Sequence, residues 1–244
     1  MKNEITITLP YYNQPEMLRK QLEIWADYSA DVAERVKVII VDDGSPDYPA
    51  LDVLKSNSIK FPINLYRINE NIPWNHGGAR NLAMTEARGW CIVTDMDHAI
   101  TEEDMRRLLS MDLERTSYYM FNRKKALADD SMEIYPRHGD SFFLTRDAYW
   151  KVGGYNEEFS GYWNGVSQLF RRNLKKKFRV VQLTDVFLIL YGRDIIPDAS
   201  ITQWSRRGGS YDLKNNPKLY SKFKKSLNHY KPVNLLRFHY EKLI

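Results

Sequence analysis

The sequence predicts an α/β fold in which a doubly wound, mainly parallel, Rossmann-like central sheet is flanked by helices. Two observations support this prediction. Short apolar or alternating runs, typical of strands, alternate four times with stretches of helical spacing over residues 5–109. The predicted strands also run into polar loops, and the carboxyl ends of parallel strands meet at one ligand-binding edge of an open sheet. The four strand ends are therefore expected to face one crevice.

The first two predicted strands lie at residues 5–9 and 36–41. The first alternates apolar and polar residues, stops at Pro10 and is followed by a loop and a helix over residues 16–27. The second is almost entirely apolar, as expected for a parallel strand that is covered on both faces. It leads directly into Asp42 and Asp43.

A third strand is predicted at residues 63–68, and a helix is expected from Ala79 to about Arg88. The fourth strand is a short apolar run that ends in Asp95 and Asp97. After it, Thr101 has the position of a helix N-cap, with an acidic residue three positions later, which predicts a helix that continues through residue 109.

The second half of the chain is less regular. It predicts strands at residues 117–122, 141–145 and 178–183, and helices at residues 146–152 and 165–174. The first of these helices is expected to stop at the Gly153-Gly154 pair. One domain is expected over residues 1–212, followed by a basic, aromatic helical tail over residues 213–244.

The composition limits the class of protein. A single cysteine, Cys91, excludes an internal disulfide framework and cysteine-based zinc sites. The sequence shows neither a signal-peptide core nor an apolar run near the ~20 residues of a membrane span, so a soluble, cytoplasmic protein is expected. From Lys214 onward the chain has seven lysines and Arg237, but only one acidic residue, Glu241. This tail either contacts a membrane surface or polyanion, or packs its aromatic side chains on the domain.

The Asp-x-Asp sequence of Asp95 and Asp97 at the end of a buried strand suggests a metal site. Hard cations such as Mg²⁺ and Mn²⁺ prefer oxygen ligands and are commonly held by one or two carboxylates together with substrate phosphates. The alternative is a solvated turn at a strand end. Convergence of Asp42, Asp43, Asp95 and Asp97 at one edge favours the site.

Five segments together resemble the nucleotide-sugar glycosyltransferases of GT-A fold, in particular the family-2 group. They match in order and spacing over about residues 4–175 and are Leu9-Pro10-Tyr11-Tyr12-Asn13, Val41-Asp42-Asp43-Gly44-Ser45, Gly78-Ala79-Arg80-Asn81, Thr94-Asp95-Met96-Asp97, and Phe142 to Arg146 continuing through Val152 to Phe159. The resemblance implies a nucleotide-sugar-binding half over residues 1–112 and an acceptor-binding half over residues 113–212.

The resemblance also implies roles for individual residues. Tyr12 would stack on the nucleobase, in a loop shaped by Pro10, and the alternative is that Tyr12 is a core aromatic. Asp43 would accept a hydrogen bond from a uracil imide. Asp42 would either help Asp43 or form a turn. The other residues expected at the nucleotide are Asn75, Arg80 and Asp95. Arg80 is expected to steady the acidic cluster rather than to touch substrate. The alternative role of Asn75 is simply to start the helix that follows it.

Asp95 and Asp97 would hold the implied Mn²⁺ or Mg²⁺ on the diphosphate, where the ion neutralises charge on the leaving group. Asp97 is the preferred direct ligand. His98 either completes the shell or is a polar loop residue, and the loop role is favoured.

The family's usual catalytic acid is missing, because Val166 and Ser167 stand where the resemblance places it. A relocated base is expected, with Asp140 first and Glu158 second, and Glu157 and His138 as further possibilities. Retention of configuration without a separate base, or donor binding without transfer, would also explain the replacement.

These features predict a metal-dependent, inverting glycosyltransferase that moves a sugar from a UDP-linked donor to a hydroxyl of a glycan or lipid-linked acceptor. Tyr162 and Trp163 are the expected acceptor platform. The rivals are a nucleotidyltransferase, which lacks its Gly-rich triphosphate loop here, and a non-catalytic sugar-nucleotide or glycan-binding module. Nucleic acid is not expected as a partner, because only the basic tail suggests it.

Overall fold

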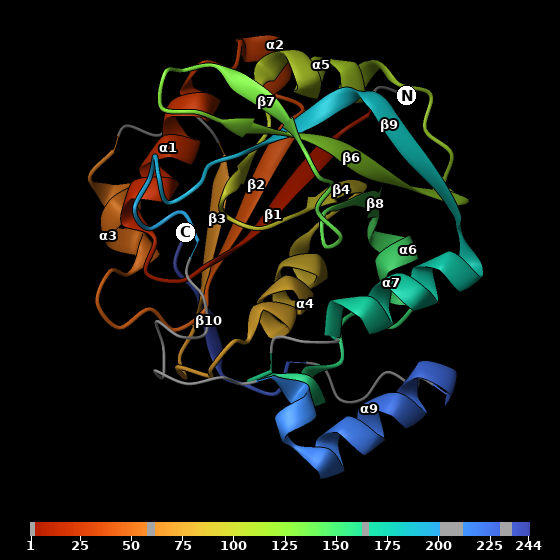
Figure 1. Ribbon diagram of the computed structural model, residues 1–244. Helices are drawn as coiled ribbons and strands as arrows, with labels where there is room; N and C mark the ends of the chain where they lie inside the picture. Colours follow the sequence, from red (N-terminus) through yellow and green to blue (C-terminus); the bar gives the residue numbers. More distant parts are fainter. Residues whose placement is uncertain (1–2, 58–61, 163–165, 201–211, 230–235) are drawn as a thin grey trace.

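A ten-stranded sheet forms the centre of the protein (Figure 1), in a computed structural model that describes residues 3–57, 62–162, 166–200, 212–229 and 236–244. The strand order is β10-β3-β2-β1-β4-β8-β6-β9-β5, and β7 pairs with β6. The strands are β1 (Ile5–Tyr11), β2 (Val36–Asp42), β3 (Ile63–Ile68), β4 (Trp90–Val93), β5 (His98–Ala99), β6 (Ser117–Ala126), β7 (Met132–Tyr135), β8 (Phe142–Thr145), β9 (Arg179–Leu190) and β10 (Tyr240–Lys242).

The sheet is mainly parallel, as the sequence predicts. β1 pairs in parallel with β2 and β4, and β2 pairs in parallel with β3. β8 is antiparallel to both β4 and β6, so β6 and its parallel partner β9 run in the same direction as β1. The carboxyl ends of β1, β2 and β4 consequently lie at one edge.

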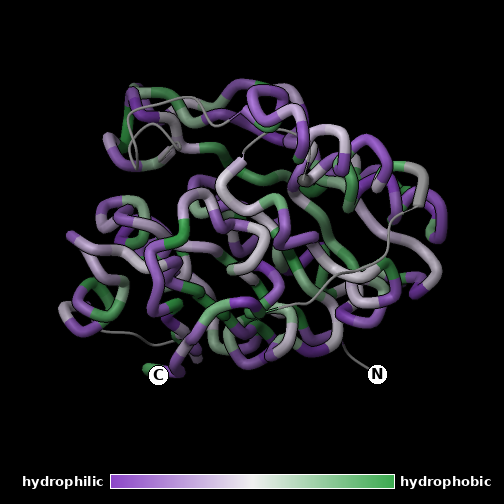
Figure 2. Tube along the Cα trace, turned by 90° about the horizontal axis from the view of Figure 1, so that it is seen from below, coloured by the Kyte–Doolittle hydropathy of each residue, from purple (hydrophilic) through white to green (hydrophobic). Residues whose placement is uncertain are grey.

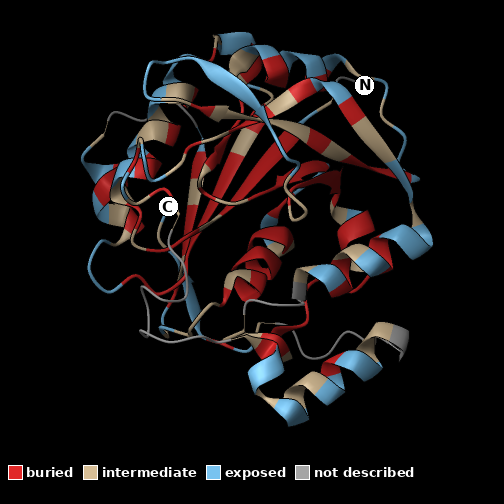
Figure 3. Cartoon of the chain, in the orientation of Figure 1, coloured by how far each residue is buried: buried red, intermediate tan, exposed pale blue. Residues whose placement is uncertain are grey.

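Helices cover both faces of the sheet, and the pleat of β2 shows why. Val38 and Ile40 pack in one buried cluster, while Ile39 and Val41 pack in another, because successive side chains on a strand point to opposite faces. The first cluster includes residues of α1 (Pro15–Ala26), α2 (Ala30–Ala33), α3 (Ala50–Lys55) and α5 (Glu102–Ser110). The second includes residues of α4 (His76–Glu86), α6 (Arg146–Lys151), α7 (Val166–Lys177) and α9 (Pro217–His229). Figure 3 shows the central strands and α4 as mostly buried. Figure 2 shows hydrophobic residues in the interior of the protein.

Local signals in the sequence account for several helix ends. The Thr101 hydroxyl accepts a hydrogen bond from the Asp104 backbone N–H at the start of α5, which confirms the predicted N-cap. Gly153 and Gly154 follow α6 with positive φ angles of 91° and 67°, a conformation that favours glycine.

Other element ends depend on tertiary contacts. The helix predicted to start at Ala79 begins at His76, because Gly77 and Gly78 enter its first turn and pack closely. A Cβ on Gly78 would lie 2.4 Å from the Asn75 side-chain oxygen. β6 and β9 are longer than predicted because each pairs along the other. The short elements α2, α3, β5, β7 and β10 are additions to the predicted set.

In the described residues of the tail expected to be helical, a short 3-10 helix (Leu213–Asn215) precedes α9, and residues 240–242 form β10 on the edge of β3. Phe223 and Phe238 are buried in the cluster that also contains residues of α4 and α7. At least these two aromatic side chains therefore pack on the domain. No helix in the part of the chain that the structure describes has the length and apolar character needed to cross a membrane.

Candidate functional site

A cleft lies at the carboxyl ends of β1, β2 and β4. The strand register places Tyr11 beside Asp42 and Thr8 beside Val93, so the loops that follow these strands start at one edge. The residues that line the cleft are Pro10, Tyr11, Tyr12, Gln14, Asp43, Trp74, His76, Asp95, Met96, Asp97, Ala199 and Ser200.

Four of the residues predicted to bind nucleotide line this cleft: Pro10, Tyr12, Asp43 and Asp95. Asp42 does not. Its two carboxylate oxygens accept hydrogen bonds from the backbone N–H groups of Ser45 (2.8 Å) and Ala50 (2.9 Å). Asp42 therefore forms the turn that follows β2, the alternative role that the sequence left open. Burial raises the pKa of its carboxyl group, against the hydrogen bond from Ser45.

Asn75 is also absent from the cleft wall. It precedes α4, where its backbone carbonyl accepts from the Ala79 N–H (3.0 Å) and its side-chain oxygen accepts from the Ser160 hydroxyl (2.8 Å). These contacts match the helix-entry role.

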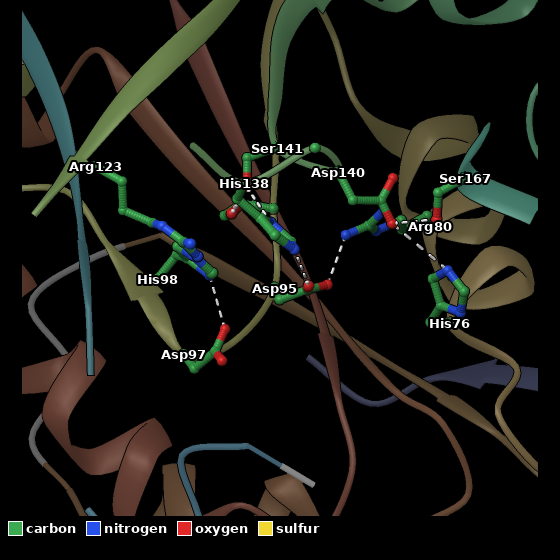
Figure 4. A network of polar contacts seen from close by, with 12 residues as sticks. His76, Arg80, Asp95, Asp97, His98, Arg123, His138, Asp140, Ser141 and Ser167 are labelled. Carbon is green, nitrogen blue, oxygen red and sulfur yellow. Dashed lines mark hydrogen bonds and ion pairs between the residues drawn. The ribbon is translucent and has the colours of Figure 1, made fainter. Parts of the chain in front are cut away.

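Arg80 lies fully buried behind the cleft and links two carboxylates (Figure 4). Its guanidinium donates to Asp95 at 2.6 Å and pairs with Asp140 at 2.8 Å. Burial alone would lower the pKa of Arg80, but the charge of Asp140 leads the effects that raise it well above its usual value. The geometry agrees with the expectation that Arg80 steadies the acidic cluster.

The same guanidinium affects the two acids. Burial acts to raise the pKa of Asp95 and of Asp140, but the positive charge of Arg80 leads the opposing effects and holds both below the usual range. Both carboxyl groups are consequently ionised at neutral pH.

Asp140 lies next to the position where the resemblance places the family's usual acid. One carboxylate oxygen accepts from the Tyr155 hydroxyl at 2.6 Å, and the other accepts from the Ser167 hydroxyl at 2.5 Å. Ser167 is one of the two residues that replace the usual acid, so a carboxylate from a different element reaches that place. Asp140 itself does not line the cleft.

A carboxylate and two imidazoles form a possible cation site in the described part of the chain. Ligand atoms of Asp95, His98 and His138 all lie within 4.8 Å of one another. The two imidazole rings stack, with centroids 4.7 Å apart. Carboxylate oxygen and imidazole nitrogen together suit a divalent transition ion.

Asp97 joins this group through His98. Its carboxylate lies 2.7 Å from His98 Nδ1, and the Arg123 guanidinium lies 2.9 Å from His98 Nε2. A guanidinium only donates, so Nε2 accepts and Nδ1 carries the proton that is shared with Asp97. Burial lowers the pKa of Arg123. His98 is 3% exposed, so it is a buried part of the site rather than a solvated loop residue.

The other candidate bases contact the tail. Glu158 forms an ion pair with Lys222 of α9 at 2.7 Å, and the buried Glu157 accepts from the backbone N–H groups of Leu236 and Arg237. Neither glutamate lines the cleft. Their contacts therefore favour a structural role in holding the tail.

Of the two residues expected to form an acceptor platform, Tyr162 accepts a hydrogen bond from the Asn216 side chain at 2.9 Å and is absent from the cleft wall. Trp163 lies outside the residues that the structure describes.

The cleft residues Gln14 and His76, and Arg123 beside His98, have no distinctive pattern in the sequence. Gln14 holds the segment after β9 by donating to the Asp198 and Ala199 carbonyls, while Asp198 accepts from the first N–H groups of α1. His76 directly follows Asn75, the residue that the resemblance implies at the nucleotide. Arg123 lies inside β6, and only its tertiary contact with His98 identifies it.

Comparison with known proteins places this geometry in context. A model of the family described as Glycosyl transferase family 2 matches residues 6–170. No curated protein matches the chain at a significant level.

Solved structures share the fold at low sequence identity. S. aureus TarS residues 1–349 in complex with UDP-GlcNAc has a TM-score of 0.71 and 15% identity, over 92% of this chain and 67% of that one. The mannosyltransferase PcManGT from Pyrobaculum calidifontis, in complex with GDP-Man and Mn²⁺, has a TM-score of 0.60 and 14% identity, over 93% and 70%. GalNAc-T7 with UDP, GalNAc and Mn²⁺ has a TM-score of 0.64 and 11% identity, over 96% and 52%. The chain spans 63% of TarS residues 1–349 in a further structure and 37% of a longer TarS chain.

Proposed function

Because the chain belongs to glycosyl transferase family 2, we propose that it moves a sugar from a nucleoside-diphosphate donor, UDP-linked, to a hydroxyl group of a glycan or lipid-linked acceptor. One observation carries the proposal. The cleft combines Tyr12 and Asp43 with the carboxylates of Asp95 and Asp97, so it offers groups that can bind both a nucleobase and a metal-bound diphosphate.

The donor end of the cleft has chemically distinct parts. Tyr12, at the turn after β1, supplies a flat ring for the nucleobase, and Pro10 shapes that turn. Asp43 accepts a hydrogen bond from the base imide. Asp42, Asn75 and Arg80 support this arrangement from behind. Structures of similar fold are complexed with UDP-GlcNAc and with GDP-Man, so the choice of uracil rests on the proposed role of Asp43.

A metal ion fits the residues present. Asp95, His98 and His138 offer a compact donor set, in which His98 Nε2 would bind the ion once Arg123 moves away from it, and Asp97 lies against His98 Nδ1. Two imidazoles favour Mn²⁺ over Mg²⁺, which prefers oxygen alone. When bound, the ion would neutralise the negative charge that develops on the leaving diphosphate. Arg80 keeps Asp95 ionised for this purpose, and Asp97 fixes the tautomer of His98.

We assign the first half of the domain to the donor and the second to the acceptor, with inversion at the anomeric carbon. The acceptor hydroxyl then attacks from the face opposite the diphosphate. Asp140, at the place of the missing acid, provides negative charge on that side, whereas Glu158 is occupied by Lys222. Tyr162 and Trp163 remain the proposed acceptor contacts, and the lysines of the tail a proposed contact with an anionic membrane surface.

Calorimetric titration of UDP, GDP, CDP and dTDP, each with and without Mn²⁺, tests the donor assignment. We expect UDP to bind most tightly, binding to need Mn²⁺, and Asp97→Ala to abolish this binding. The matched control is Asp47→Ala, which changes a surface carboxylate that contacts Asn13. If none of the four nucleotides binds, the proposed function is wrong.

One observation favours a second candidate, a sugar-nucleotide-binding module without transfer activity. A hydroxyl, that of Ser167, stands in place of the acid that the family uses as base. Slow hydrolysis of a bound nucleotide sugar by the protein would exclude this candidate, because a module without catalysis releases no nucleoside diphosphate.

A further inference from the structure

We propose that His76 is the general base of the transfer reaction and that Asp140 stabilises the imidazolium formed on it. The inference rests on the proposed function and supplies the base that the altered α7 lacks. A histidine thereby takes the place of the carboxylate that the sequence led us to expect.

The contacts of Asp140 argue against its acting directly. Its two oxygens receive hydrogen bonds from Tyr155 (2.6 Å) and Ser167 (2.5 Å), and the Arg80 guanidinium lies 2.8 Å away. Each of these contacts stabilises the ionised carboxylate and weakens it as a proton acceptor. Because Asp140 does not line the cleft, an acceptor hydroxyl would reach another group first.

His76 is that group. It lines the cleft with Asp95 and Asp97, and its Nε2 lies 3.7 Å from the Asp140 carboxylate (Figure 4). The backbone at the start of α4 positions the ring, which also makes edge contacts with Trp74 and Tyr155 at centroid distances of 5.6 and 5.9 Å. The side chain is 18% exposed, so a substrate can reach a ring that packing holds in place.

The charges around His76 suit a base. Asp140 and Asp95 are negative, Arg80 is positive, and Tyr155 is neutral because burial raises its pKa well above the usual value. Asp140 is the carboxylate beside the ring, 3.7 Å from Nε2, and would face the imidazolium. Histidine ordinarily titrates near pH 6.5, so as a residue type it accepts a proton at neutral pH without a large change in environment.

The transfer step forms one bond, breaks one bond and moves one proton. A lone pair of the acceptor oxygen forms the new bond to the anomeric carbon while the bond from that carbon to the diphosphate oxygen breaks. The electron pair of the broken bond leaves with the nucleoside diphosphate. The hydroxyl proton passes to His76 Nε2, beside the Asp140 carboxylate, and the imidazolium later releases it to solvent.

Donor hydrolysis, in which water serves as the acceptor, tests the role of His76 in the full chain. The readout is release of UDP from UDP-GlcNAc and UDP-glucose between pH 5 and 9, with UDP affinity measured in parallel. We expect the wild-type rate to fall toward pH 5, as the base takes up a proton. His76→Gln should lose about 100-fold or more in rate and lose this acidic limb, with UDP affinity within about threefold.

Two variants separate a base from a structural residue. Asp140→Asn should keep the acidic limb but shift it to lower pH, because the imidazolium loses its counter-charge. His76→Gly should regain activity when imidazole is added, which repair of packing alone would not explain. His239→Gln is the control, since His239 is 89% exposed and pairs with Glu70.

The inference is overturned if His76→Gln keeps the acidic limb, if the limb disappears in Asp140→Asn or His138→Gln instead, or if the wild type binds UDP and releases none from either donor. In each case UDP binding leaves the donor assignment standing. Failure of wild-type protein to bind any nucleotide is a different result and removes the proposed function itself.

Discussion

Replacement of Arg80 by methionine should destabilise the fold strongly at neutral pH. Methionine keeps an apolar stem but leaves Asp95 and Asp140 without the guanidinium that contacts them at 2.6 and 2.8 Å. Arg80 is fully buried, and removal of one partner from a buried ion pair costs about 3–5 kcal/mol. We expect a loss of that order in the free energy of unfolding at pH 7.5.

The effect should depend on pH in a direction that the pKa shifts fix. In the wild type, Arg80 leads the effects that lower the folded-state pKa of both carboxyls, so their contribution is full above about pH 4 and is lost as pH falls through the lowered values. In the variant, burial remains and raises both pKa values. The carboxyls then take up protons at a higher pH than in the wild type, so the loss should be smaller at pH 5.0 than at pH 7.5.

Urea unfolding followed by tryptophan fluorescence at pH 7.5 and 5.0 measures both quantities. The matched control is Arg106→Met, because Arg106 also pairs with two carboxylates, Asp31 and Glu102, but its side chain is 46% exposed. That change should cost no more than about 1 kcal/mol. Equal costs at the two arginines, or a pH-independent cost at Arg80, would refute the reasoning.

Two further substitutions and one labelling experiment have definite expected results. Tyr12→Ala should raise the Kd for UDP at least fivefold in calorimetry, because loss of one base-stacking ring costs about 1–3 kcal/mol. Glu157→Gln should speed amide hydrogen exchange at Leu236 and Arg237 and lower the free energy of unfolding by about 2 kcal/mol, because a buried charged acceptor of both N–H groups is lost. Burial raises the pKa of Cys91 to about 12, so a thiol reagent at pH 8 should label the native protein far more slowly than the urea-unfolded chain.

Each of these has its own control. Tyr48→Ala, at a ring that is 57% exposed, should leave the UDP Kd unchanged, and an equal effect at both tyrosines would contradict base stacking. Glu158→Gln removes only a pair with the exposed Lys222, so it should leave amide exchange at Leu236 and Arg237 unchanged. Unchanged exchange in Glu157→Gln would show that the tail is held elsewhere. Rapid labelling of folded protein would contradict the burial of Cys91.

Much of the fold follows from local patterns. The apolar run of β2 has nearly the predicted limits, β3 has the predicted ones, and Thr101 caps α5 as expected. Strand periodicity and helix capping are properties of neighbouring residues, so one sequence reveals them. β10 could not be found this way, since its pairing partner β3 lies far earlier in the chain.

For the site, the sequence by itself determined which residue types stand at the ends of β1, β2 and β4, and hence a cleft with an aromatic ring and carboxylates. Only the tertiary structure decided their separate positions: Asp42 in a turn, Asp43 in the cleft, Glu157 and Glu158 against the tail, and Asp140 beside Ser167. It also brought His76, Arg80 and Arg123 to these acids. The physical reason is that ion pairs and hydrogen bonds depend on the packing of whole helices against the sheet, which spacing along the chain does not encode.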